Sequence, residues 1–224
     1  LDAGASRISV EVEGGGLQRL QITDNGHGIR QQELALAITR HATSKLRQFS
    51  ELEDLLTYGF RGEALPSIAS VSRLKIESRH LENESGYRLS AEGTTEAVPE
   101  PVGHPVGTSI EVVDLFFNVP ARRKFLKSAN TEAGHISEVL LDAALCRPDV
   151  SFQFKRDGRV TRKYPLSDNR AQRVQQVLTD SELLHLKAQK GPLQIEALLC
   201  NPQKARRGTQ GCLLYTSPSP RDLT

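Results

Sequence analysis

The first hydrophobic residues of the chain alternate with polar ones. They are Ile8, Val10, Val12, Leu20 and Ile22. The glycines at 14–16 interrupt this series. Because successive side chains of a strand point to opposite faces of a sheet, the alternation predicts two strands joined by a turn, the second ending at Asp24.

A helical spacing follows these strands. Leu34, Ala37, Ile38 and His41 recur at helical intervals, which predicts a helix over about residues 30–41. We interpret His41 as the end of the apolar face of this helix, and therefore as structural rather than catalytic. The next twenty or so residues, 42–62, lack sustained periodicity, which is typical of a segment hinged by glycine.

Strand and helix patterns are mixed in the middle of the chain. Strands are predicted over 71–77, 86–91 and 108–115, and a helix is predicted over 131–146. This order of elements predicts an α+β fold.

The last patterned part begins with a second hairpin, over residues 152–164, whose turn is predicted at Asp157-Gly158. A polar stretch, 167–173, then leads into a helix-like run. Two apolar segments, 183–186 and 193–199, follow it. We expect the first domain to close at this hairpin and a second one to begin after it.

Candidate chemistry is concentrated in two short strings. The first, Asp24-Asn25-Gly26-His27-Gly28-Ile29, follows a strand directly and sets one carboxylate beside two glycines. Glycines let a backbone approach a flat ligand, and a carboxylate accepts hydrogen bonds such as the one that the N6 amine of adenine donates. Asn-Gly after a strand is also the commonest signal of a hairpin turn, so both interpretations stay open here.

The second string is Gly59-Phe60-Arg61-Gly62-Glu63-Ala64-Leu65. Two glycines flank an arginine, and a run compatible with a helix follows. Free N–H groups at the start of a helix bind anions, so this string is a candidate phosphate site.

Both strings resemble the MutL family of DNA mismatch-repair ATPases, within the superfamily of gyrase, heat-shock chaperone, histidine kinase and MutL (GHKL). Further segments agree in order and spacing: 40–45 (RHATSK), Gly107-Thr108 before a strand, and 115–126 (LFFNVPARRKFL). The resemblance covers roughly residues 1–211. It implies a Bergerat-type α+β ATP-binding sandwich, a mixed sheet with helices on one face. A topoisomerase or histidine kinase is disfavoured, because residues 121–126 resemble MutL alone.

The resemblance also implies roles for individual residues. Asp24 would accept from adenine N6 and hold a water that Thr108 also bonds, while Gly26 and Gly28 let the backbone approach the base. We interpret Glu63 as structural at a helix start rather than as a catalytic base. The residues that would gather the triphosphate, with positive charge from a lysine and an arginine, are Thr43, Ser44, Lys45, Gly59, Phe60, Arg61, Gly62, Glu63, Ala64 and Leu65. The alternatives for Lys45 and Arg61 are a surface lysine and a structural salt bridge.

The two ends of the sequence suggest a piece of a longer protein, because its 224 residues contain no methionine. In the family, a helix before the segment Leu1-Asp2-Ala3-Gly4 carries a glutamate that activates water and an asparagine that ligates Mg²⁺. Neither residue is in this sequence, although Asp2 and Ala3 match the tail of the motif. We therefore expect this chain to bind ATP weakly and to hydrolyse little, and we assign it no catalytic residue and no metal ligand.

The tail that begins at Cys212 resembles no part of the family. Residues 212–222 match, codon for codon, the translation of a transposase adaptor used in sequencing libraries. The alternative is a disordered Ser/Pro tail. We expect three parts: residues 1–170 as the ATP-binding domain, 171–211 as the linker and opening elements of a second domain of the ribosomal S5-like type, and 212–224 as adaptor-derived.

Charge and cysteine content limit the choice of partners. The chain has 29 basic and 27 acidic residues, a net charge of +2, so any DNA contact should be weak, local and sensitive to salt. One candidate patch is Arg122, Arg123, Lys124 and Lys127, and a second is Lys204, Arg206 and Arg207. A solvated surface is the alternative for both. Cys146 and Cys200 share no metal or redox spacing, so we interpret them as buried, reduced core thiols.

The resemblance implies a function for the parent protein. ATP binding and hydrolysis would couple mismatch recognition to downstream repair through a homodimer, a mismatch-recognition protein and a nuclease or helicase. No apolar run is long enough to span a bilayer, and we expect a cytoplasmic protein associated with the nucleoid. The alternative function is a non-hydrolysing, nucleotide-responsive or DNA-binding interaction module.

Overall fold

The computed structural model describes residues 1–39, 63–92, 98–178, 183–191 and 193–200. The chain divides into two units. The first consists of Leu1–Glu138 and Phe152–Lys163, and the second of Val139–Ser151 and Tyr164–Thr224.

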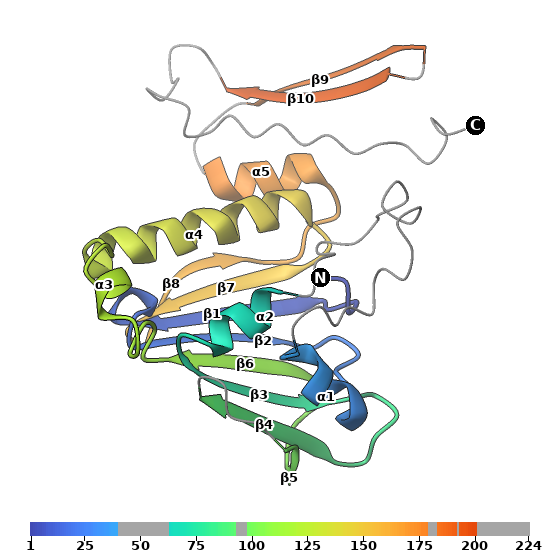
Figure 1. Ribbon diagram of the computed structural model, residues 1–224. Helices are drawn as coiled ribbons and strands as arrows, with labels where there is room; N and C mark the ends of the chain where they lie inside the picture. The colour runs from blue at the N-terminus through green and yellow to red at the C-terminus, as the bar shows by residue number, and fades with distance from the viewer. Residues whose placement is uncertain (40–62, 93–97, 179–182, 192, 201–224) are drawn as a thin grey trace. The chain divides into compact units, whose positions relative to one another are not determined.

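An eight-stranded sheet forms the frame of the first unit (Figure 1). Its order is β5-β4-β3-β6-β2-β1-β7-β8, and the pairs from β5 to β1 are antiparallel. The strands are β1 (Arg7–Glu13), β2 (Arg19–Asp24), β3 (Arg73–Arg79), β4 (Gly86–Glu92), β5 (Glu100–Val102), β6 (Gly107–Val113), β7 (Ser151–Arg156) and β8 (Arg159–Tyr164). A short 3-10 turn, η1 (Gly14–Gly16), joins β1 to β2.

Two short helices cover one face of this sheet, namely α1 (Gln31–Ala37) and α2 (Ala64–Ala69). Leu34 of α1 and Ala69 of α2 are buried in one cluster with Leu74, Ile76, Leu89, Ala91 and Val112 of the strands. Burial of such apolar side chains is the main favourable term in folding. This cluster therefore holds the two helices against β3, β4 and β6.

Three strands of the sheet are in register at the centre, so their side chains form rows on the helix-covered face. Leu20, Val112 and Leu74 form one row, and Ile22, Ile110 and Ile76 form the next. The third row consists of Asp24, Thr108 and Ser78. The face thus changes from apolar to polar where β2 ends.

Two further helices follow β6: α3 (Pro120–Arg123) and α4 (Ala129–Cys146). In the first unit, α4 lies close to η1. A Cβ added at Gly15 would overlap the backbone of Ala129, and one at Gly16 would lie 2.9 Å from Cδ1 of Ile136.

The second unit contains α5 (Arg170–Leu178) and a hairpin of β9 (Leu183–Lys190) and β10 (Leu193–Cys200). Arg173 of α5 is fully buried, and its Nη2 donates to the carbonyl oxygens of Pro148 at 2.9 Å and Val150 at 2.7 Å. This arginine therefore connects α5 to the turn that follows α4. Among the described residues, no helix is both long and apolar enough to cross a membrane.

The first predicted helix is shorter than the spacing suggested. We expected residues 30–41, whereas α1 ends at Ala37, and Ile38 (φ −104°, ψ 2°) leaves the helical region. The Thr39 hydroxyl donates to the carbonyl of Ala35 at 2.9 Å and so competes with the main-chain bond that would extend the helix. His41 and the segment 42–62 lie outside the described residues.

The predicted strand at 71–77 is displaced, because β3 runs over Arg73–Arg79. Val71 N–H and the Ser72 hydroxyl both donate to the carbonyl of Ile68, at 3.1 and 2.7 Å, and so continue the end of α2. The other predicted strands and the 152–164 hairpin are confirmed to within two residues, with Asp157 (φ 47°) and Gly158 (φ 77°) in its turn.

Cys146 differs in part from the expectation of a buried core thiol. It is a free thiol, but it is only half-buried at the end of α4. Its partial burial raises the pKa of the thiol above its ordinary value. The side chain of Cys200 lies outside the described residues.

Candidate functional site

The loop after β2 carries the first candidate string. Asp24 ends the strand, and its Oδ1 accepts a hydrogen bond from the backbone N–H of Gly26 at 2.8 Å. Next to it, Asn25 Oδ1 accepts from the N–H groups of Ser6 and Arg7, at 3.0 and 2.8 Å. The loop is therefore fixed both to the carboxylate and to the N-terminal segment.

This loop is not the turn of a hairpin. The strands paired with β2 are β1 and β6, and the loop leads instead into α1. The hairpin interpretation of Asn25-Gly26 is therefore wrong. The bonds of Asn25 give its side chain a different structural role, which is to hold Ser6 and Arg7 at the start of β1.

Both glycines of the string are required by contacts within the chain. A Cβ at Gly26 would lie 2.7 Å from the Cβ and the carbonyl oxygen of Ala3. Gly28 has φ +75°, and a Cβ there would overlap the carbonyl of Arg79 at the end of β3. These contacts account for both glycines without a ligand. The close approach of the backbone to a nucleotide base therefore stays a prediction.

The polar row places Thr108 directly between Asp24 and Ser78. Ser78 is fully buried and Thr108 is 6% exposed. The Ser78 Oγ lies 2.9 Å from Thr108 Oγ1, and Gly107, with φ +124°, packs so tightly that a Cβ there would overlap the carbonyl of Asp24. Two candidate residues predicted from separate motifs, Asp24 and Thr108, are thus brought together by strand register.

Two residues of this region were not predicted from the sequence as part of the site. Ser78 is one polar position in an ordinary strand pattern, and only the register with β6 gives it a special place. Ile22 stands on the same face as Asp24, one row away, yet it is 41% exposed. An exposed aliphatic side chain beside a carboxylate is a surface on which a flat heterocycle can lie.

The remaining predicted residues are only partly described. Glu63 immediately precedes α2, which begins at Ala64 and continues through the half-buried Leu65. The others lie outside the described residues: Thr43, Ser44, Lys45, Gly59, Phe60, Arg61 and Gly62. Among the residues described, no group of three His, Cys, Asp or Glu side chains is placed to hold a metal ion.

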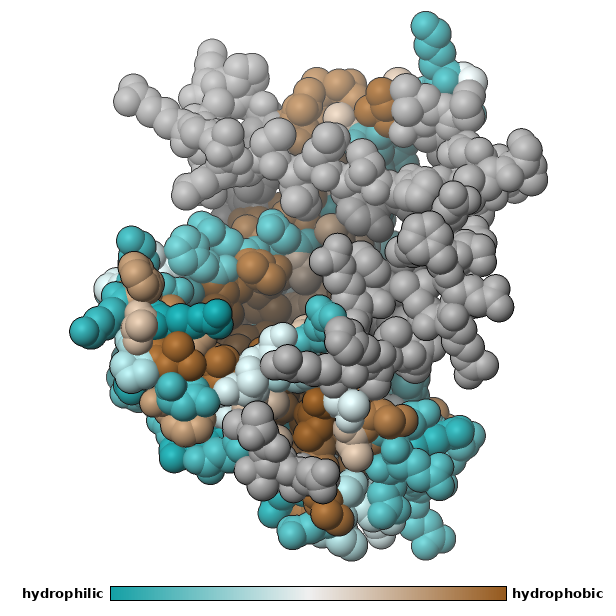
Figure 2. Space-filling model, in the orientation of Figure 1, coloured by the Kyte–Doolittle hydropathy of each residue, from teal (hydrophilic) through white to brown (hydrophobic). Residues whose placement is uncertain are grey.

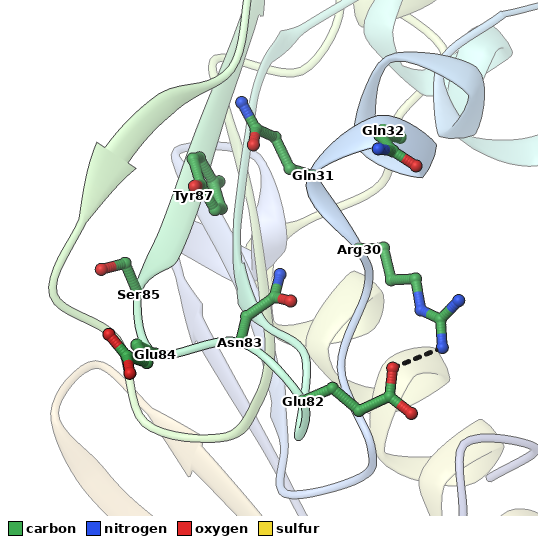
Figure 3. Close-up of a pocket in the computed structure, with 8 residues that line it drawn as sticks. All are labelled: Arg30, Gln31, Gln32, Glu82, Asn83, Glu84, Ser85 and Tyr87. Atoms are coloured by element: carbon green, nitrogen blue, oxygen red, sulfur yellow. Dashed lines mark hydrogen bonds and ion pairs between the residues drawn. The ribbon is translucent and has the colours of Figure 1, made fainter.

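A cavity of about 550 Å³ lies elsewhere, between the start of α1 and the β3–β4 connection (Figure 3). Its main charged pair is Arg30 with Glu82, whose Nη2 and Oε2 atoms are 2.6 Å apart. The lining residues are Arg30, Gln31, Gln32, Glu82, Asn83, Glu84, Ser85 and Tyr87. None of the predicted site residues contributes to this cavity, so it is a separate feature.

The basic patch predicted around α3 is exposed. Arg122, Arg123, Lys124 and Lys127 are all exposed, and Phe125 among them is 83% exposed. In Figure 2, hydrophilic surface covers much of the edge at which Figure 1 places α3. The second predicted patch, Lys204, Arg206 and Arg207, lies outside the described residues.

Known proteins are similar to this chain in sequence and in fold. Residues 1–117 match the profile of the histidine kinase-, DNA gyrase B- and HSP90-like ATPase family. The DNA mismatch repair protein MutL of Trichlorobacter lovleyi is 43% identical over 215 residues, which are 96% of this chain and 36% of that protein. MutL of Shewanella oneidensis is 47% identical over 209 residues, 90% of this chain and 33% of that protein. The chain thus spans about a third of the length of these relatives.

Solved structures agree with this result. The Aquifex aeolicus MutL ATPase domain complexed with ADP has a TM-score of 0.65 and 33% identity, and the match covers 84% of this chain and 66% of that one. The ATPase region of Saccharomyces cerevisiae topoisomerase II shares the fold alone, with a TM-score of 0.59 at 14% identity over 82% of this chain and 49% of that one. The predicted class, an α+β fold in which helices cover one face of a mixed sheet, is confirmed.

The polar row at the end of β2, the glycines packed around it and these similarities support one assignment. The chain belongs to the histidine kinase-, DNA gyrase B- and HSP90-like ATPase family, and within that family it is similar to MutL mismatch repair proteins.

Proposed function

We propose that this chain binds ATP at the end of β2, with the adenine ring beside Asp24 and Thr108. The observation that carries the proposal is the polar row, in which a carboxylate and a hydroxyl predicted from separate motifs stand in register on adjacent strands. A carboxylate accepts a hydrogen bond from the N6 amine of adenine. A water bonded to both side chains would complete the polar contacts along the same edge of the base.

The residues around Asp24 can accommodate an adenine ring. Its Oδ1 already accepts from Gly26 N–H, so the carboxylate is held in one orientation. Ile22, which is 41% exposed one row away, offers an apolar surface for the ring. Burial of a ring on such a surface and one charge-assisted hydrogen bond together give both affinity and orientation.

We assign the triphosphate to the residues that the sequence predicts to bind phosphate. Lys45 and Arg61 supply positive charge in this proposal, Thr43 and Ser44 supply hydroxyl groups, and the string from Gly59 to Leu65 supplies N–H groups at the start of α2. Mg²⁺ would neutralise phosphate charge when bound. We assign no ligand of the metal to this chain.

The test is ATP affinity, measured by calorimetry on the full chain and on Asp24→Asn. The proposal predicts that this substitution weakens ATP binding by about tenfold to a hundredfold, the usual effect of losing a hydrogen bond to a charged group. Asp114→Asn, the same chemical change at the opposite end of β6, is the matched control and should leave the affinity unchanged. Equal affinities in the wild-type chain and Asp24→Asn would refute the proposal.

For the whole protein we propose a role in DNA mismatch repair, because its relatives are MutL proteins. ATP binding would then favour pairing of two ATPase domains in a homodimer, and hydrolysis would reverse it and signal to a mismatch-recognition protein and a downstream nuclease or helicase. A cytoplasmic location follows from this role.

A second candidate function is a weak, sequence-independent contact with DNA at α3. The four exposed cations Arg122, Arg123, Lys124 and Lys127 favour it. Contacts of cations with phosphates weaken as salt rises. Arg122→Glu/Arg123→Glu should therefore reduce both DNA affinity and its salt dependence, measured by fluorescence anisotropy, whereas Arg159→Glu, at an exposed position on β8, should do neither. A salt dependence that is the same in all three proteins would exclude α3.

A further inference from the structure

Asn25 joins the loop after β2 to the N-terminal segment through its side chain. Its Oδ1 accepts from the backbone N–H groups of Ser6 and Arg7, at 3.0 and 2.8 Å. Its Nδ2 donates to the hydroxyl oxygen of Ser6 at 2.9 Å. Both lone pairs of the amide oxygen are thus used, and because its partners are N–H donors, only this orientation of the amide fits. Asn25 therefore ties two consecutive residues of the N-terminal segment to the loop.

Backbone contacts continue this connection. The N–H of Asn25 donates to the carbonyl of Arg7 at 3.3 Å. Two residues further on, the N–H of His27 donates to the carbonyl of Ala3 at 2.9 Å. Between them, Gly26 packs so closely that a Cβ there would lie 2.7 Å from the Cβ of Ala3. The loop therefore lies against the N-terminal segment.

This connection begins one residue after the carboxylate of the proposed site. Asp24 is the last residue of β2, and its Oδ1 accepts from the N–H of Gly26 at 2.8 Å. Asn25 stands between these two residues in the chain. The orientation of the Asp24 carboxylate thus depends on where the loop holds the Gly26 N–H. Since the printed bonds of the Asn25 side chain all go to the N-terminal segment, Asn25 acts on the site through its neighbours.

We propose that Asn25 is a positioning residue for nucleotide binding: by tying the loop to the N-terminal segment, it holds the Gly26 N–H, and through it the Asp24 carboxylate, in the binding orientation. A group that is fixed before its ligand arrives binds more tightly, because less conformational freedom is lost on binding. This role rests on the proposed ATP site and adds the contacts that support it.

The test is ATP affinity, measured by calorimetry on the full chain, on Asn25→Ala and on Asn25→Asp. The alanine variant lacks all three side-chain hydrogen bonds of Asn25. Its ATP affinity should be lower by about threefold to tenfold, as expected when one hydrogen bond to the ligand is weakened. The aspartate variant should restore most of the affinity, because a carboxylate accepts from both N–H groups and the Ser6 hydroxyl can turn and donate to it.

Asn130→Ala is the matched control. Asn130 is also an exposed asparagine, and its Oδ1 accepts from Nη2 of Arg156. It lies at the start of α4, outside the proposed site. This variant should leave ATP affinity unchanged, even where its melting temperature falls.

A double-mutant comparison shows whether Asn25 acts through Asp24. In an Asp24→Asn background no carboxylate remains to be positioned, so adding Asn25→Ala should change ATP affinity by less than about twofold. If Asn25→Ala does not fold, Ser6→Ala takes its place. It removes only the acceptor of the Asn25 amide nitrogen, and it should lower ATP affinity by about twofold to threefold.

Several results would count against this role. Wild-type affinity in Asn25→Ala, or in Ser6→Ala where it takes its place, would overturn it while leaving the ATP site intact. An affinity that Asn25→Asp does not restore, or one that falls equally in the Asp24→Asn background, would do the same. Equal affinities in the wild-type chain and Asp24→Asn would overturn the proposed function and this role together.

Discussion

Around Asp24, single residues are constrained mainly by the backbone of neighbouring segments. Gly28 faces the carbonyl of Arg79, and Gly107 faces the carbonyl of Asp24 itself. Both have positive φ, a region in which an L side chain is strained. The two loops that flank the candidate site are therefore held in place before any ligand binds.

Replacing Gly107 should destabilise the fold and displace Asp24. A Cβ at Gly107 would overlap the Asp24 carbonyl at φ +124°, and such strain and overpacking together cost roughly 2 to 4 kcal/mol. Urea denaturation of Gly107→Ala measures this loss. Gly103→Ala is the control, since a Cβ there meets nothing within 4 Å. Equal stability of the two variants would show that the close approach is absent in solution.

The sequence predicted Asp24 and Thr108 as site residues, but it did not single out Ser78 or Ile22. The chemistry of Asp24 can be interpreted from its own string, and the role of Thr108 is what the resemblance to the family implies. The importance of Ser78 comes from bonds to Ile29 and Gly107, 49 and 29 residues away, which only the paired strands bring together. No local pattern encodes such contacts.

At the scale of the elements, the two faces of the sheet have different chemistry. On the face opposite α1 and α2, Glu111 of β6 bonds Lys75 of β3 and Arg19 of β2, at 2.6 Å each. Burial alone would raise the pKa of the Glu111 carboxyl, but its hydrogen bonds to Lys75 and Arg19 hold the pKa below its ordinary value. Three adjacent strands are thus joined by one carboxylate.

This lowered pKa predicts a pH dependence of stability. A carboxyl whose pKa is depressed by folding stabilises the protein above its unfolded pKa, near 4.5, and this contribution is lost as pH falls through the lower, folded value. Melting temperatures measured between pH 6 and pH 3 should therefore fall less steeply in Glu111→Gln than in the wild-type chain. Parallel curves for the two proteins would show that Glu111 does not contribute.

The sequence predicted which segments are helices or strands better than it predicted where these elements end. Alternation predicted β1 and β2, and buried positions do alternate along β1. The turn signal Asp157-Gly158 predicted the β7–β8 hairpin. The end of α1 was missed because a side-chain bond of Thr39 decides it, and β5 was missed because three residues, one of them proline, give no period. Such boundaries depend on hydrogen bonds that cannot be inferred from a hydrophobic pattern.

At the scale of the whole molecule, the described part of the candidate site belongs to the first unit only. Asp24, Thr108 and Ser78 are all within Leu1–Glu138. The second unit has its own buried centre at Arg173, whose pKa is lowered by desolvation. A substitution that destabilises the second unit should therefore leave the stability of the candidate site unchanged.

Arg173→Met tests this separation. It keeps most of the side-chain volume but removes the Arg173 donor from the carbonyl of Val150, a loss of about 1 to 3 kcal/mol for a buried group, while the carbonyl of Pro148 keeps the N–H of Ser167 at 2.9 Å. Amide hydrogen exchange should become faster in α5 and at residues 147–151 and stay unchanged in β2 and β6. Arg159→Met, at an exposed position, is the control. Faster exchange throughout both units would contradict two separate units.

The most direct test of the nucleotide site is an NMR titration of the ¹⁵N-labelled chain with ADP. Binding at the polar row predicts that the largest amide shifts occur at Asp24–Ile29 and Thr108, with smaller ones at Ser78, and none at Glu82–Tyr87 beside the separate cavity. Shifts confined to Glu82–Tyr87, or no shifts at all at millimolar ADP, would contradict the proposed function.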